Sequence, residues 1–153
     1  MHNGGLQADF IKEICCLSCQ DFLERYLLFS VAPVLENVKP SVLFNFRGIN
    51  IEVWEKIKNL FCEITGLEVF PLCRKPTSLV VLFFNKDSLN NIKKDKKSNE
   101  ILSNKGYPDT KDIYILLFYL KERFRQSFPH EVGLFLGYPP YDVESFIKNK
   151  GKN

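Results

Sequence analysis

The chain has 153 residues and a formal net charge of +3, which is too small to predict binding to nucleic acid or to an anionic membrane. Its length fits one domain spanning residues 1–153, large enough to bury a core. Fourteen phenylalanines against one methionine predict that this core is bulky and aromatic.

The N-terminal part of the chain predicts helices followed by a strand. Residues 1–6 are expected to be disordered, and residues 7–17 form a short helix with apolar side chains on one face. A sequence similar to a capping box at residues 18–21 starts a second helix, which Pro33 disrupts. Residues 41–46 then have the composition of a strand.

The middle of the chain predicts a helix and then a β-hairpin. Asn50 can cap a helix over residues 51–65, and Gly66 is the signal that ends it. Two strands follow over residues 67–74 and 78–85, and their linker is short enough for a hairpin. The second strand is continuously apolar, which is typical of a central strand buried on both faces. The helix residues expected to face inward are Val53, Ile57, Leu60, Phe61 and Ile64.

The second half of the chain is predicted to be helical. Asp87 begins a short helix, and the lysine-rich run at 93–97 is expected to be a solvated connection rather than a phosphate-binding patch. A helix over residues 98–104 follows, and Asp109 caps the longest helix, which ends at Gln126. Apolar residues surround the first half of this helix, so we expect it to be central to the core.

The most distinctive stretch is residues 128–143, which predicts two short helices joined at a Gly-Tyr-Pro-Pro corner. Ser127 can cap the first helix, and Gly137 can take the left-handed conformation that ends it. The proline pair then fixes the corner and starts the second helix. That helix presents one apolar face, made by Val143, Phe146 and Ile147.

These elements together predict an α+β (mixed α/β) fold class. A right-handed crossover makes the first two strands parallel, and the hairpin makes the last two antiparallel. The expected sheet is therefore small, mixed and three-stranded. Several helices from both ends of the chain must cover it.

The sequence from Phe128 to Pro139, continued by Asp142-Val143 and Phe146-Ile147, resembles the signature of a bacterial family. This is the family called domain of unknown function (DUF) 3793, which is common in clostridia and other Firmicutes. The similarity extends more loosely over most of the chain. It implies a fold and a lineage, but it brings no established activity.

The chain departs from that family in two places. The family often has a cysteine just before its Ala-Pro sequence, where this chain has Val31. Members usually continue into a cysteine-rich tail, whereas this sequence ends at Asn153. The resemblance therefore implies no metal or redox role for such a tail here.

His130 and Glu131 are the candidate catalytic residues of the distinctive stretch. A histidine can serve as a base, a ligand or a hydrogen-bond donor, and a glutamate can act beside it. Adjacent helical residues point about 100° apart, so the two need not share a site. The alternative is that His130 helps to cap its helix while Glu131 complements the helix dipole. Tyr138 and Tyr141 are candidate aromatic contacts of a binding surface.

Cys16 and Cys19 have the spacing of a redox or metal-binding pair. A closed zinc site needs four ligands, and the sequence has no second pair of this kind, so we expect incidental thiols and no metal. The five cysteines also argue against a disulfide framework. No nucleotide-binding or hydrolase motif is present, and the sequence leaves any cofactor unknown.

The longest apolar run, residues 113–120, is much shorter than the roughly 20 residues of a membrane span. The N-terminus lacks the features of a signal peptide, so we expect a cytoplasmic protein. An acidic start to the last helix argues against a helix-turn-helix that reads DNA. We therefore expect neither nucleic acid nor membrane as a partner.

Two classes of function are consistent with the sequence. The first, which we favour, is a non-catalytic module that binds a small molecule or a protein around residues 128–143. The second is a small enzyme, or a redox- or metal-linked protein, that uses His130 and Glu131 or Cys16 and Cys19. A pocket that gathers polar groups around His130 would favour an enzyme. A flat, partly apolar surface around the two tyrosines would favour a binding module.

Overall fold

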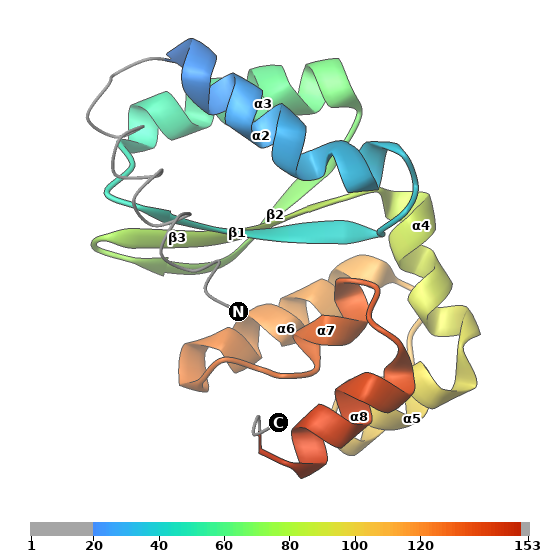
Figure 1. The fold of residues 1–153 in the computed structure, drawn as a ribbon. Helices are drawn as coiled ribbons and strands as arrows, with labels where there is room; N and C mark the ends of the chain where they lie inside the picture. The colour runs from blue at the N-terminus through green and yellow to red at the C-terminus, as the bar shows by residue number, and fades with distance from the viewer. Residues whose placement is uncertain (1–19, 151–153) are drawn as a thin grey trace.

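The computed structural model describes residues 20–150, with side chains from Arg25 onward. Two layers of helices enclose a three-stranded sheet (Figure 1). One layer is formed by α2 (Gln20–Leu35) and α3 (Ile51–Thr65). On the other side lie α5 (Lys96–Asn104), α6 (Ile113–Gln126), α7 (Val132–Phe135) and α8 (Pro140–Lys148). The link between the sheet and this second layer is made by α4 (Lys86–Asn90) and the 3₁₀ helix η1 (Asn91–Lys94).

The sheet contains β1 (Ser41–Arg47), β2 (Glu68–Lys75) and β3 (Ser78–Phe84) in the order β1-β3-β2. The predicted α+β class is confirmed, but the predicted mixed sheet is wrong because both neighbouring pairs are antiparallel. The crossover through α3 does make β1 and β2 run in the same direction. They lie on opposite sides of β3, so they do not pair with each other.

β3 is the central strand, as its continuous apolar sequence predicted. Its side chains alternate between two apolar clusters, one on each face of the sheet. Val81 and Phe83 pack beneath α2 and α3, whereas Leu82 and Phe84 pack against the other helical layer. Burying each of these side chains contributes about 1.5–3 kcal/mol, so the strand holds both layers to the sheet.

The cluster beneath α2 and α3 is aromatic, in agreement with the composition of the chain. The ring of Phe83 contacts Phe44, Trp54 and Phe61, with centroid distances of 5.5, 6.1 and 5.1 Å. All three contacts are edge-to-face, the arrangement that ring quadrupoles favour.

The predicted ends of α3 are confirmed. The Asn50 side chain accepts hydrogen bonds from the backbone N–H groups of Glu52 (2.8 Å) and Val53 (3.3 Å). Gly66 ends the helix with φ +69°. The buried face of α3 differs from the prediction, because Trp54 joins Ile57 and Phe61 in the core while Val53, Leu60 and Ile64 are exposed.

Other helix boundaries differ from the predictions. α2 continues through Pro33, because Val34 in its last turn is fully buried. Asn85 rather than Asp87 caps α4, and Asp112 rather than Asp109 caps α6. The lysine-rich run is divided between η1 and α5, and the Nζ atom of Lys93 is buried. The predicted helix over residues 7–17 lies outside the described residues.

The long helix α6 packs through one face only. Its buried stripe is Ile113, Leu116, Leu117 and Leu120. The opposite apolar side chains, Tyr114, Ile115, Phe118 and Tyr119, are exposed, so the prediction of a helix buried nearly all round is wrong. Within residues 20–150, no helix has the length and apolar character needed to cross a membrane.

Replacing Leu117 with Ala should lower the free energy of unfolding by about 2–5 kcal/mol, because this side chain is fully buried in the apolar cluster that α6 shares with the sheet. The matched control is Phe118→Ala on the next residue, whose ring is 55% exposed and whose loss should cost less than about 1 kcal/mol. Urea denaturation of both variants measures the difference. Equal losses would contradict the described orientation of α6.

Candidate functional site

The segment between α6 and α8, which we call the corner, contains less helix than the sequence predicted. Ser127 ends α6 by donating its backbone N–H to the carbonyl of Arg123 (3.3 Å), and it does not cap a following helix. Two successive turns lead into α7, where the N–H of Val132 bonds to Pro129 (3.1 Å) and that of Gly133 bonds to His130 (3.2 Å). α7 is a single turn, and Gly137 ends it with φ +85°.

Two contacts attach this corner to the beginning of β1. The hydroxyl of Ser41, itself buried, donates a hydrogen bond of 2.6 Å to the carbonyl of Phe135. Gly137 packs against Pro40 so closely that an added Cβ would lie 2.6 Å from the proline Cδ. The corner therefore has a fixed position relative to the sheet, although 94 residues separate Ser41 from Phe135.

Replacing Gly137 with Ala should destabilise the protein more than the same change at Gly106. Both glycines have left-handed φ values, +85° and +86°, where an alanine costs about 1–2 kcal/mol. Only at Gly137 would the new methyl group also collide with another residue, adding about 1–3 kcal/mol. Thermal denaturation of the two variants tests this difference, and equal destabilisation would show that the contact with Pro40 is loose.

Glu131 is buried, and its carboxylate is bonded to other side chains of the protein. Its carboxylate accepts a hydrogen bond from the Tyr107 hydroxyl (3.2 Å) and hydrogen bonds from the Nε and Nη2 atoms of Arg123. Burial, together with the negative charge of Glu131, raises the pKa of Tyr107, so this phenol stays a hydrogen-bond donor. The three residues join α6, the loop before it and the corner.

His130 does not cap α7, contrary to one of the interpretations above, because α7 has no side-chain cap. Instead it lines a cavity of about 410 Å³ between the corner and α8, which we call the corner cavity. Phe128 and Val132 line the side next to His130, and Asp142 lines the side formed by α8. The full lining consists of Phe128, His130, Val132, Gly133, Leu136, Tyr138, Asp142, Val143 and Phe146.

Aromatic rings surround the imidazole. The ring of Phe146 meets it edge-on at a centroid distance of 5.0 Å, and Phe128 lies at 6.2 Å. The Nδ1 atom of His130 is buried and has no hydrogen-bond partner among the residues that the structure describes. Buried polar atoms are nearly always bonded, so an unpartnered one calls for an explanation such as a ligand.

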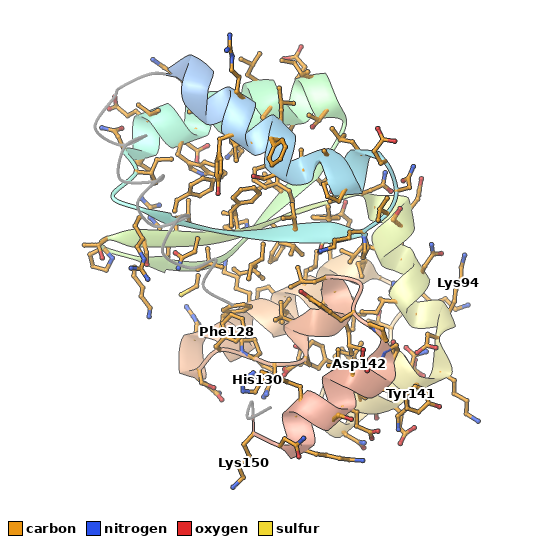
Figure 2. The ribbon with its side chains drawn as sticks, in the orientation of Figure 1. Lys94, Phe128, His130, Tyr141, Asp142 and Lys150 are labelled. Carbon is orange, nitrogen blue, oxygen red and sulfur yellow. The ribbon has the colours of Figure 1, made fainter. Side chains whose placement is uncertain are left out.

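The predicted site residues do not all come together. His130 and Tyr138 both line the corner cavity, whereas Glu131 and Tyr141 do not. Figure 2 shows Tyr141 beyond Asp142, on the side of α5. Its ring is 69% exposed and lies 5.7 Å from the ammonium of Lys97 on that helix. Cys16 and Cys19 lie outside the described residues.

Asp142 also lines the cavity, although its sequence position did not mark it as a candidate site residue. Its spacing from Phe146 is one helical turn, which places both residues on the same side of α8. That spacing was the available signal, because Phe146 was already predicted to lie on the apolar face of this helix. Figure 2 shows Asp142 on α8 and His130 on the corner, in the same helical layer.

No group of three or more potential metal ligands occurs among the residues that the structure describes. Cys62 and Cys73 are free thiols on two different elements, α3 and β2. Burial raises the pKa of Cys62, which disfavours the reactive thiolate.

Replacing Glu131 with Gln should lower the free energy of unfolding by about 1.5–3 kcal/mol, because it removes charge-assisted hydrogen bonds from a buried position. Glu122→Gln is the matched control, since this exposed glutamate pairs with Arg125 on the surface of α6 and contributes less than about 1 kcal/mol. Urea denaturation measures both. Unchanged stability in Glu131→Gln would argue that Glu131 has a role other than structure.

The comparisons with known proteins identify the family. A family model described as "Protein of unknown function (DUF3793)" matches residues 27–153, so the chain belongs to this family and the resemblance noted in its sequence is confirmed. The chain has no significant match among curated proteins or among solved structures.

Proposed function

We propose that this member of the DUF3793 family is a bacterial, cytoplasmic binding protein without catalytic activity, and that it holds a small, largely apolar molecule in the corner cavity. We expect neither nucleic acid nor a membrane among its partners. One observation carries the proposal. The buried, unpartnered Nδ1 of His130 belongs to a residue that lines an apolar cavity.

The size and lining of the cavity support a small ligand. Its volume of about 410 Å³ lies within the range of about 300–1,000 Å³ found for ligand sites. Such sites combine apolar walls with a few polar groups that orient the ligand. Here Val132, Leu136 and Val143 supply apolar wall, while His130 and Asp142 supply polar groups.

Asp142 lines the same cavity as His130, but no hydrogen bond joins the two side chains within the described residues, and this favours binding over catalysis. A catalytic histidine normally needs a partner within hydrogen-bond reach that orients it or exchanges protons with it. Glu131, the partner suggested by the sequence, is bonded to Arg123 and Tyr107 instead. Phe128 and Phe146 provide the ring contacts of the imidazole, and these hold it without activating it.

Benzyl alcohol is a suitable probe, because it combines an aromatic ring with one hydroxyl group that can meet His130. We expect it to shift backbone amide NMR signals within residues 128–146. Leu136→Trp, which adds bulk at a half-buried lining position, should weaken this binding at least about tenfold by filling the cavity. The control is Leu35→Trp on α2, at a partly exposed position outside the cavity, which should bind as the natural sequence does.

A thermal melt of each variant establishes that it is folded before binding is compared. Shifts that lie outside residues 128–146, or binding that Leu136→Trp leaves intact, would place the probe elsewhere and contradict the proposal.

A further inference from the structure

The charge of the corner cavity comes from one side chain. Asp142 is an acid, and no lysine or arginine is found among the described residues that line the cavity. A ligand with a negative charge would therefore meet an unneutralised carboxylate. A ligand with a positive charge would gain an attraction that the cavity otherwise leaves unused.

The two acidic side chains of α8, Asp142 and Glu144, differ in their ion pairs. Glu144, two residues later, pairs with Lys97 at 3.0 Å and with Lys148 at 3.3 Å. These lysines lower the pKa of Glu144, which keeps it charged. Asp142 has no ion pair within the described part of the chain. The carboxylate that lines the cavity is thus the one left without a cation.

The aromatic rings of the cavity also suit a cation. Ammonium groups are attracted to the faces of aromatic rings within about 6 Å. The corner already shows this contact, since the ammonium of Lys39 lies 5.8 Å from the ring centroid of Tyr138. Phe128 and Phe146 provide two more rings in the lining.

Hydrogen bonding points in the same direction. A carboxylate can only accept hydrogen bonds, and an imidazole nitrogen accepts one when its proton is on the other nitrogen. Within the described residues, neither the exposed carboxylate of Asp142 nor the buried Nδ1 of His130 receives a hydrogen bond from the protein. A protonated amine carries several N–H donors, whereas an alcohol carries one.

From the cavity, Asp142 and the rings together, we infer that the ligand is an organic amine with a compact aromatic or aliphatic body. The ammonium group pairs with Asp142 and faces the rings, and the apolar body lies against Val132, Leu136 and Val143. This inference rests on the proposed binding function and assigns the class of ligand that the cavity selects.

Three probes of the same ring size test the ligand class: benzylamine, benzyl alcohol and benzoate at neutral pH. We expect benzylamine to bind about tenfold more tightly than benzyl alcohol, and benzoate to bind most weakly. Titrations followed by backbone amide NMR shifts give the three affinities at the same site. Raising the salt concentration should weaken the preference for benzylamine, because Asp142 is exposed and its attraction is screened.

Asp142→Asn should reduce the affinity for benzylamine to about that for benzyl alcohol and leave benzyl alcohol unchanged. Glu144→Gln is the matched control, because it removes the same charge from the same helix at a position outside the cavity lining. It should preserve the preference for benzylamine. A thermal melt shows that both variants are folded, and the salt dependence of the natural sequence tests the inference without any variant.

The outcomes separate the ligand class from the proposed function. Equal binding of benzyl alcohol and benzylamine at residues 128–146 would overturn the amine class and leave the binding function standing. Tighter binding of benzoate than of benzylamine would also overturn the amine class and leave the binding function standing. No binding of any probe at these residues would count against both, and an equal loss of preference in Glu144→Gln would show that the net charge of α8, rather than Asp142, selects the ligand.

Discussion

The carboxylate of Glu131 is buried, and a buried charge is stable only with partners that supply opposite charge and hydrogen bonds. Arg123 and Tyr107 meet this requirement, so the corner must sit where α6 and the preceding loop can both reach it. Its neighbour His130 lines the cavity instead, and its Nδ1 has no hydrogen-bond partner within the described residues. Of these two adjacent residues, Glu131 therefore fixes the corner and His130 lines the cavity.

The residues that line the cavity are close together in the sequence, but contacts with a distant part of the chain hold them in place. Its lining residues all come from the last part of the chain, between Phe128 and Phe146. Its position is held from outside, by the bond from Ser41 and by the contact of Gly137 with Pro40 at the start of β1. A pocket held in this way is formed before a ligand arrives, which reduces the conformational entropy that is lost on binding.

Sequence reasoning succeeded where the cause is local. The cap at Asn50, the stop at Gly66 and the central position of β3 each follow from a few residues. It failed where the structure depends on packing between elements that are distant in the sequence. The sequence of α6 is apolar nearly all round, so it could not show that only one face meets the sheet. No local signal showed that β1 pairs with β3 rather than with β2.

The same contrast between local sequence and distant packing applies to the candidate site. The stretch 128–143 was found from its own sequence, and His130 and Tyr138 do line the cavity there. The roles of Glu131 and Asp142 could not be assigned, because they depend on where Arg123, Lys97 and the rings lie in space. Since the side chain of Asp142 makes no hydrogen bond or ion pair within the described residues, its charge can govern ligand choice while the fold depends on Glu131 and Gly137.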